Sequence, residues 1–421
     1  MNTEIISIGD ELLIGQVINT NQAYIAERLN SVGIFADRMT TVGDNEQDIL
    51  SAFDQAWKTH TVVTVTGGLG PTHDDITRAA VCKFFQTDLV IDDETLNNVT
   101  SFFRRRNLPL TELNRDQARV PRGCTVIQNT KGTAPGYFFE RDEKFFIVMP
   151  GVPYEMKEMT DSFVVPFFSS RPTGTVIQHR TLKTTGISES FLAEKLKDIT
   201  PLLSSKKNVT LAYLPSPTGV RLRISVKAQS TAEAANEIRF FEQAIRSKVE
   251  PYIYGTDSEE LEEVIGRILT EKLLTLAIAE SCTGGFIAHK ITNVSGSSTY
   301  FERGYVTYSN ESKCTELGAP RTAIQQFGTV SKEVAEAMAF GARKKANTSI
   351  ALAVTGIAGP TGGTEEKPVG LVWIGYSDEQ ETFAIKNIFS GERTIIKERA
   401  AQAALELLRR KLLLIPIDSN E

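Results

Sequence analysis

A serine lies within the sequence AESCTGG, at Ala279–Gly285, where a predicted strand passes into a predicted helix. A turn of this kind exposes the Ser281 hydroxyl and directs the backbone N–H groups of residues 282–285 toward a developing oxyanion, with Thr283 and Gly284 as the candidate oxyanion residues. We therefore expect a nucleophilic serine. Two alternatives stay open: Ser281 could simply cap the helix, and Cys282 could be the nucleophile, although no histidine motif accompanies it to activate the thiol.

A serine nucleophile needs a base, and the sequence YVTYSNESK at Tyr305–Lys313 supplies the candidates. The chain has four scattered histidines, and no Ser-His-Asp arrangement is evident. If Lys313 is removed from water, its pKa falls, and the neutral amine can accept the Ser281 proton. Tyr308 could relay or stabilise that proton. A lysine that follows a loop is commonly a solvated surface cation, and the sequence leaves this alternative open.

A glycine-rich turn at Thr355–Gly363 follows another predicted strand and is suited to hold an anion through backbone N–H groups. Gly356 and Gly359 are its candidate contacts. Arg393 opens the predicted final helix and could contact a phosphate, while N-capping by Ser390 would explain that segment equally well.

A second glycine-rich turn follows a strand near the N-terminus, and its candidate anion-binding residues are Gly67, Gly68, Gly70 and Thr72. Carboxylates lie at the mouth of the next helix, where they would repel a bare phosphate unless a divalent cation intervened. Further carboxylates follow other strands. The predicted metal ligands are therefore Asp75, Asp10, Asp44 and Asp74, with helix capping and solvated loops as the alternative explanation.

Regular elements must position these residues, and their pattern predicts three domains. In residues 1–168, strands and helices alternate at 5–8, 22–29, 62–65, 76–84 and 145–149. In residues 255–421 they alternate at 274–279, 286–291, 305–308, 332–345, 350–355, 371–376 and 393–412. In residues 169–254, apolar and charged side chains alternate at 220–227, between helical patterns at 188–198 and 231–249. We expect two three-layer α/β domains flanking a small α+β domain.

Composition narrows the functional classes. The 421 residues contain 46 Lys or Arg and 52 Asp or Glu, and this net charge of −6 argues against a generally basic nucleic-acid binder. The four cysteines have no CxxC spacing, so reduced thiols are expected, and any metal should be bound by oxygen atoms. With no signal peptide and no membrane-spanning run in the sequence, we expect a cytoplasmic protein.

The middle segment differs in charge from the rest of the chain. Residues 171–250 contain 13 Lys or Arg and 7 Asp or Glu, a balance of +6. This balance is the best indication of nucleic-acid contact, but no GxxG loop or RNP-like aromatic strand accompanies it. A solvated sheet face explains Arg221, Arg223 and Lys227 equally well, so nucleic-acid binding is the less favoured alternative.

The motifs together resemble the CinA family. The N-terminal segment resembles its molybdopterin-binding-like domain through the sequences at 9–11, 15, 19–21, 66–72, 75, 77, 131–136 and 150–155. The C-terminal segment resembles its nicotinamide mononucleotide deamidase domain through those at 279–285, 305–313, 355–363, 367–370 and 390–393. The resemblance describes the middle domain as KH-like and implies a homodimer.

The resemblance implies two hydrolytic reactions that recycle pyridine nucleotides. In the C-terminal domain, Ser281, Tyr308 and Lys313 match the catalytic residues that deamidate nicotinamide mononucleotide (NMN) to nicotinate mononucleotide and ammonia, without a cofactor. In the N-terminal domain, the implied reaction is hydrolysis of ADP-ribose to AMP and ribose 5-phosphate with a divalent cation such as Mg, Mn or Co. The implied partners are these small nucleotides rather than a membrane.

Two other functions are less favoured. A pterin-binding enzyme is disfavoured because Asp74 stands where enzymes of molybdopterin synthesis usually have an arginine. A DNA- or nucleotide-binding interaction protein is suggested by the basic middle segment and by the family's link to competence.

Overall fold

The computed structural model describes residues 1–72, 75–171, 174 and 176–417. The chain divides into two compact units, which we describe separately. One comprises Met1–Gln178 with Lys227–Ala235, and the other comprises His179–Val226 with the chain from Asn236 onward.

The first unit is built on a sheet with the strand order β2-β1-β3-β8-β7-β6. The bounds are β1 Asn2–Ile8, β2 Phe35–Val42, β3 Val62–Thr66, β6 Thr125–Ile127, β7 Gly136–Arg141 and β8 Lys144–Met149. Pairing is parallel from β2 through β8 and antiparallel at β7 and β6. The predicted strands and the mostly parallel sheet are confirmed, whereas β2, β6 and β7 were not predicted.

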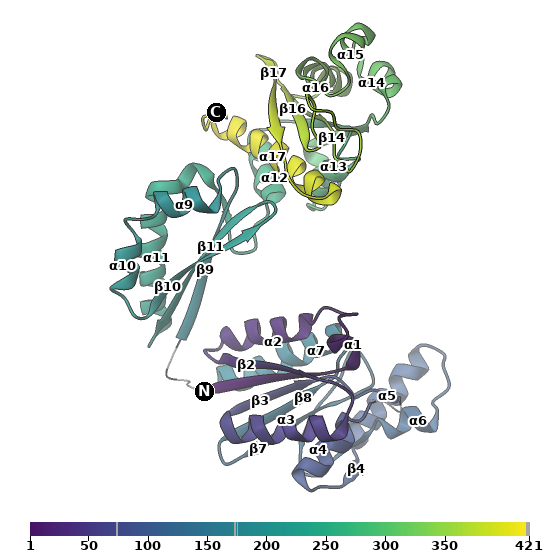
Figure 1. Ribbon diagram of the computed structural model, residues 1–421. Coiled ribbons are helices and arrows are strands. Elements are labelled where there is room, and N and C mark those ends of the chain that lie inside the picture. The colour runs from purple at the N-terminus through teal and green to yellow at the C-terminus, as the bar shows by residue number, and fades with distance from the viewer. Residues whose placement is uncertain (73–74, 172–173, 175, 418–421) are drawn as a thin grey trace. The chain divides into compact units, whose positions relative to one another are not determined.

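Helices cover both faces of this sheet, as Figure 1 shows. The helices α2 (Thr20–Asn30) and α7 (Pro153–Met159) pack on the face that carries Ile5 and Ile147. The helices α3 (Glu46–Thr59) and α4 (Thr77–Phe85) pack on the face that carries Ile6 and Val65. The remaining elements are α1 Asp10–Leu13, β4 Leu89–Ile91, α5 Asp93–Arg105, α6 Glu112–Asp116, β5 Arg119–Pro121, the π-helix Thr160–Val164 and α8 Val165–Ser169.

A smaller antiparallel sheet follows, with the order β10-β11-β9-β12. Its elements are β9 Val176–Thr184, α9 Glu189–Lys195, α10 Thr200–Ser204, β10 Val209–Ser216, β11 Gly219–Ala228, α11 Thr231–Val249, the 3₁₀ turn Glu250–Tyr252 and β12 Ile253–Thr256. The predicted alternation in β11 is confirmed, because its apolar side chains are buried and its arginines are exposed. The predicted helix at 188–198 is shorter, because α9 begins after its Ser188 cap and ends at Lys195.

Many basic side chains of this middle segment are in ion pairs. Lys206 contacts Glu237 at 2.5 Å, Arg246 contacts Glu242 at 2.9 Å, and Lys183 contacts Glu260 at 2.7 Å. Internal pairs of this kind neutralise part of the local positive charge and weaken the argument for a nucleic-acid surface.

The third sheet has the order β14-β13-β15-β16-β17, with β14, β13 and β15 parallel and β16 and β17 antiparallel. The strands are β13 Leu276–Glu280, β14 Phe301–Val306, β15 Ile350–Gly356, β16 Leu371–Ser377 and β17 Thr382–Ile388. The helices are α12 Leu261–Glu271, α13 Phe286–Thr292, α14 Asn310–Leu317, α15 Arg321–Phe327, α16 Lys332–Ala346 and α17 Arg393–Leu413, with a 3₁₀ turn at Ser297–Thr299.

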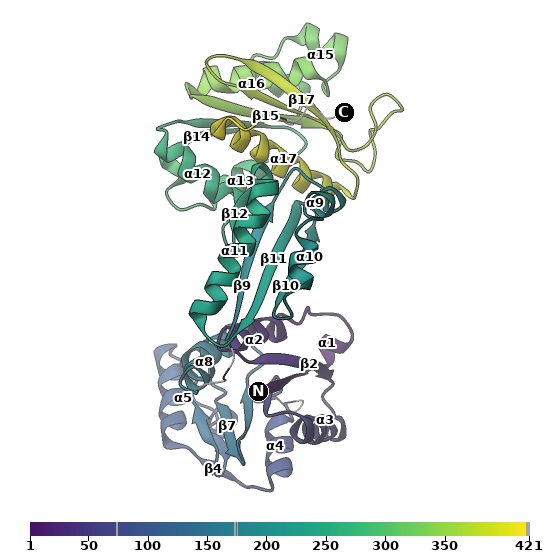
Figure 2. The ribbon, with the colours of Figure 1, turned by 90° about the vertical axis from the view of Figure 1, so that its left-hand side faces the viewer.

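Residue alternation along β13 explains the two helical layers. Leu276 and Ile278 face the core formed with α12, α13 and α17, whereas Ala277 and Ala279 face α16. Figure 2 shows α16 and α17 on opposite faces of the sheet. The two three-layer α/β arrangements and the small middle fold are as predicted.

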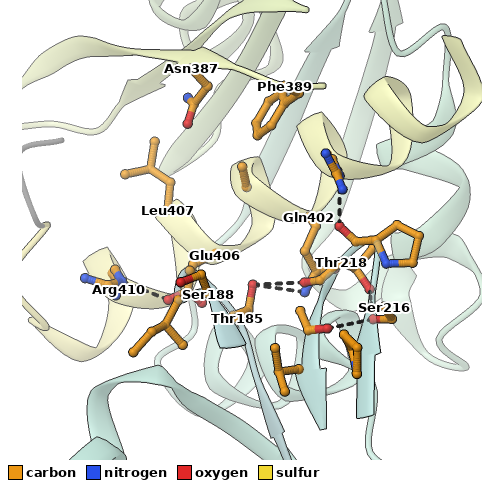
Figure 3. A pocket seen from close by; sticks show the side chains of 18 of the residues that line it. Thr185, Ser188, Ser216, Thr218, Asn387, Phe389, Gln402, Glu406, Leu407 and Arg410 are labelled. Carbon is orange, nitrogen blue, oxygen red and sulfur yellow. Dashed lines mark hydrogen bonds and ion pairs between the residues drawn. The ribbon is translucent and has the colours of Figure 1, made fainter. Parts of the chain in front are cut away.

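The helix α17 also packs on the middle sheet within this unit. The Arg409 side chain donates to the carbonyl of Pro251 at 2.6 Å and forms an ion pair with Glu406. A cavity of about 570 Å³ lies beside this helix. Figure 3 shows Gln402 and Glu406 on its α17 side and Thr185 and Ser216 on the middle-sheet side. No helix in the described part of the chain is long and apolar enough to cross a membrane.

Candidate active site

The turn that carries Ser281 lies at the carboxyl end of the central strand β13. Its backbone is fixed by the neighbouring strand, because the Ser281 N–H donates to the Val354 carbonyl at 2.9 Å. Gly284 and Gly285 have φ values of 63° and 95°, a left-handed conformation that favours glycine and lets α13 start directly after the turn. The predicted strand-to-helix turn is therefore confirmed.

Lys313 lies against this serine. Its Nζ is 3.0 Å from the Ser281 Oγ and 2.8 Å from the Thr307 carbonyl oxygen. The lysine lies in the first turns of α14, which begins after a capping box at Ser309. Sequence analysis predicted this serine–lysine pair, and the structure brings the two side chains together.

The surroundings of Lys313 favour its neutral form. The residue is only 1% exposed, and burial lowers the pKa of its amine below the ordinary range. Both of its hydrogen-bonding partners are uncharged oxygens, and no carboxylate of the described chain forms an ion pair with it. An amine in this state can accept a proton from the adjacent hydroxyl, so the surface-cation alternative is excluded.

Glu280, directly before the serine, holds the turn in place. Its buried carboxylate accepts N–H groups from Gly285 at 3.0 Å, Ile287 at 3.1 Å and Ala288 at 2.9 Å. These charge-assisted bonds satisfy the first N–H groups of α13 and couple the helix to β13. Sequence analysis missed this role, although an acidic residue between an apolar strand and a helix N-terminus was a usable signal.

Two backbone N–H groups of the turn remain available for an oxyanion. In the described structure, the N–H groups of Cys282 and Thr283 donate to no other residue, whereas Gly284 donates to the Ser281 carbonyl at 3.1 Å. The geometry therefore supports Thr283 as predicted. The Gly284 N–H already closes the turn, so the Cys282 N–H is the candidate second donor and Gly284 is less suited to that role.

Cys282 is not suited to be the nucleophile. Burial raises the pKa of its thiol to about 12, so the reactive thiolate is scarce at neutral pH. The structure thus favours the Ser281 hydroxyl over this rival.

Tyr308 lies in the loop after β14, which ends at Val306 rather than at Tyr308 as predicted. Its side chain is 60% exposed, and its hydroxyl accepts a hydrogen bond from Arg393 at 2.8 Å. Arg393 also donates to the Gly359 carbonyl at 2.6 Å. The structure therefore joins the predicted Tyr308, Arg393 and Gly359, but with the Tyr308 hydroxyl bonded to Arg393 rather than to Ser281 or Lys313 in the described chain.

Close packing requires both glycines of the predicted anion turn. A Cβ atom on Gly356 would lie 2.7 Å from the Leu371 carbonyl oxygen, and one on Gly359 would lie 2.5 Å from a Val369 methyl group. Packing thus explains their residue type, and their contact with a phosphate stays a prediction.

The N-terminal turn also has the predicted left-handed glycines, with φ values of 115° at Gly67 and 65° at Gly68. Two of its amides are already engaged, because Asp75 accepts the Gly70 N–H at 2.8 Å and the Thr72 N–H at 2.9 Å. Asp75 therefore acts in this structure as an internal cap of the turn, the alternative that the sequence left open.

The other predicted metal ligands lie at the same sheet edge. The Asp10 N–H donates to the Asp44 carboxylate at 3.0 Å, and the Asp44 N–H donates to the Asp10 carboxylate at 3.1 Å. Asp74 lies outside the described residues. Among those described, no group of three or more His, Cys, Asp or Glu side chains could hold a metal ion. The described donor set does not form a ready-made cation site.

A further carboxylate at this end of the first unit was missed. Glu155 is buried, accepts the Asn129 amide at 2.7 Å and lies where a side chain on Gly132 would collide with it. Burial raises the pKa of Glu155 above its ordinary range. Sequence analysis noted Gly132 and Glu155 only as parts of motifs, since their contact depends on the tertiary fold.

The fold and the sites define a chain with two α/β domains, one carrying a glycine turn at a parallel-sheet edge and the other a buried serine–lysine pair. Family descriptions match all three parts: "Probable molybdopterin binding domain" at residues 4–170, "Damage-inducible protein CinA KH domain" at 179–255 and "CinA C-terminal domain" at 258–412. A protein from Caldicellulosiruptor saccharolyticus is 45% identical over 413 residues, 98% of this chain and 100% of that protein. The chain belongs to the CinA family.

Further relatives agree. The "CinA-like protein" of Kosmotoga olearia is 44% identical over 98% of this chain and 99% of its own length. A solved structure described as the competence/damage inducible protein CihA from Agrobacterium tumefaciens is 37% identical over 37% of this chain and 97% of that chain, with a TM-score of 0.35.

Removal of the Glu280 carboxylate should destabilise the fold. Glu280→Gln keeps the size of the side chain but turns an NH₂ donor toward backbone N–H donors, so we expect unfolding to become easier by about 2–4 kcal/mol. Denaturant unfolding followed by circular dichroism measures the change. The matched control is Glu302→Gln on the exposed part of β14, and equal stability of the two variants would contradict the role assigned to Glu280.

Proposed function

We propose that the C-terminal domain deamidates nicotinamide mononucleotide to nicotinate mononucleotide and ammonia. The observation that supports this proposal best is the 3.0 Å contact between the Lys313 Nζ and the Ser281 Oγ. The lysine is buried and has no carboxylate partner in the described chain, which is the environment a neutral amine base requires.

The reaction would proceed through an acyl-enzyme. Ser281 Oγ attacks the carboxamide carbon while Lys313 Nζ accepts the hydroxyl proton, and the N–H groups of Cys282 and Thr283 bind the oxyanion. Collapse breaks the C–N bond, and the Lys313 ammonium protonates the leaving nitrogen to give ammonia. Lys313 then deprotonates a water molecule that attacks the ester, which releases the nicotinate product and restores Ser281. These steps consume one water and need no cofactor.

Tyr308 would act differently from a proton relay. Its exposed ring and its hydrogen bond to Arg393 suit a wall of the substrate site that holds the arginine in place. Arg393 and the turn containing Gly356 and Gly359 would then contact the nucleotide phosphate, as the family resemblance implies.

We also propose that the N-terminal domain hydrolyses ADP-ribose to AMP and ribose 5-phosphate. The supporting observation is the strand order β2-β1-β3, because Asp44, Asp10 and the turn at Gly67 each follow one of these adjacent parallel strands and therefore meet at one edge of the sheet. A divalent cation, when bound there, would supply charge neutralisation at the pyrophosphate. Asp10 and Asp44 are the described side chains placed to hold it, once their mutual hydrogen bonds are released.

Replacing Ser281 tests whether the two proposed reactions take place in separate domains. Ser281→Ala should lower ammonia release from nicotinamide mononucleotide by at least about 10³-fold, because Ser281 supplies the hydroxyl that Lys313 contacts in the described structure. ADP-ribose turnover by the same variant should equal that of the unaltered chain. Coupled detection of ammonia and chromatography of AMP measure both reactions, and undiminished ammonia release would disprove the serine mechanism.

The lowered pKa of Lys313 predicts a pH dependence. The neutral amine is the active base, so kcat/KM for deamidation should rise with pH and level off above the Lys313 pKa. Burial lowers that pKa, so the rising part of the pH profile should lie below the pH range in which an ordinary lysine loses its proton. Lys313→Arg, which cannot lose its proton, should be inactive throughout. A rate that falls as the pH rises over the same range would contradict the role of Lys313 as the base.

Chelation tests the cation at the N-terminal domain. ADP-ribose turnover should disappear in excess EDTA and return when Mg, Mn or Co is added, whereas ammonia release should continue in EDTA. Asp10→Asn should weaken the response to added metal, with Asp54→Asn on the exposed face of α3 as the control. Full ADP-ribose turnover in EDTA would rule out the metal assignment.

A further inference from the structure

Lys397 is a cation beside the Ser281 turn to which neither sequence analysis nor the mechanism assigns a role. It lies in the second turn of α17 and is partly buried. A Cβ atom placed on Gly284 would be 3.7 Å from the Lys397 Nζ, and the positive charge of this lysine helps to lower the pKa of Cys282 against the larger effect of burial. The ammonium group therefore lies next to the turn that carries the nucleophile.

This ammonium group has no partner among the described residues, where the Lys397 side chain forms no hydrogen bond and no ion pair. Two other lysines of this domain differ: Lys290 contacts Glu262 at 2.9 Å, and Lys367 donates to the Val330 carbonyl at 2.8 Å. The ammonium N–H donors of a partly buried lysine that has no acceptor in the protein are available to a ligand.

Arg393 adds a second uncompensated charge on the same side of α17. It precedes Lys397 by four residues, so the two side chains neighbour each other about 6 Å apart along the helix. Its hydrogen-bond acceptors, the Gly359 carbonyl and the Tyr308 hydroxyl, are uncharged. Like charges at this spacing destabilise a helix by a few tenths of a kcal/mol, and a bound anion would remove that penalty.

We propose that Lys397 binds the phosphate monoester of the substrate together with Arg393, and thereby makes the C-terminal site select a nucleotide over the corresponding nucleoside. This proposal rests on the deamidase function proposed above. A phosphate monoester carries close to two negative charges at neutral pH, which matches one ammonium and one guanidinium. The oxyanion that would form next to Ser281 does not need Lys397, because the N–H groups of Cys282 and Thr283 are available to bind it.

The test compares two substrates that differ only in the phosphate, nicotinamide mononucleotide and nicotinamide riboside. Lys397→Met keeps the length of the side chain without its charge. It should raise KM for the mononucleotide by about 10- to 100-fold, the effect of one charge-assisted hydrogen bond, and leave its kcat within about threefold. The kinetic constants for the riboside should not change. Lys397→Arg should restore most of the mononucleotide affinity.

A control variant separates the local effect from the loss of net charge. Lys386→Met removes an exposed lysine of β17 that has no partner in the described chain, and it should behave as the unaltered protein. An equal rise in KM for both substrates, or a loss of kcat with KM unchanged, would overturn the phosphate assignment, because either result would place Lys397 at the carboxamide end of the substrate.

Binding measurements separate this proposal from the deamidase function. In the Ser281→Ala background, titration calorimetry should show that Lys397→Met weakens binding of the mononucleotide 10- to 100-fold and leaves riboside binding unchanged. If the unaltered chain releases no ammonia, the deamidase proposal fails, and this calorimetric comparison still decides the role of Lys397. Equal mononucleotide affinity with and without Lys397 would overturn the assignment whether or not ammonia is released.

Discussion

The exclusion of water from one amine is the constraint on which the C-terminal domain depends. Lys313 is almost completely buried, and its only acceptors in the described structure are a hydroxyl and a backbone carbonyl. A carboxylate at this position would favour the charged amine and leave little of the neutral form that can accept a proton. The protein instead places its nearby carboxylate, Glu280, on the other side of the turn, where backbone N–H groups bind it. Burying the Lys313 amine lowers the stability of the fold, but it leaves the amine able to act as a base.

Strand register brings the parts of this site together. Parallel pairing aligns Glu280 of β13 with Val306 of β14 and Val354 of β15, so the segments after these strands leave the sheet at one edge. Ser281 follows the first and Lys313 the second. The core on both faces of β13 fixes this register, because a shift by one residue would exchange its large and small side chains between α17 and α16. The same packing therefore determines both the fold and the serine–lysine distance.

The sequence predicted what local pattern determines and missed what tertiary contact determines. Ser281 and Lys313 could be predicted because each follows a recognisable strand and their residue types fit one reaction. The sequence directed the N–H groups of residues 282–285 toward the oxyanion, but it could not show which of them are free, since that depends on which amides Glu280 and the turn already occupy. The strand predicted through Tyr308 ended early for a similar reason: Ser309 caps α14, and the preceding residues must leave the sheet to reach that helix.

Charge in the two α/β domains has to be interpreted locally. The chain carries −6, and removing the +6 of residues 171–250 leaves −12 for the remainder, which is unfavourable for an anionic substrate. Many of the cations cannot offset this, because carboxylates already pair with them, as Glu262 does with Lys290. Arg393 has only neutral acceptors and Lys397 has none in the described chain. An anion entering the C-terminal site would therefore meet positive charge only where the protein has left its own cations uncompensated.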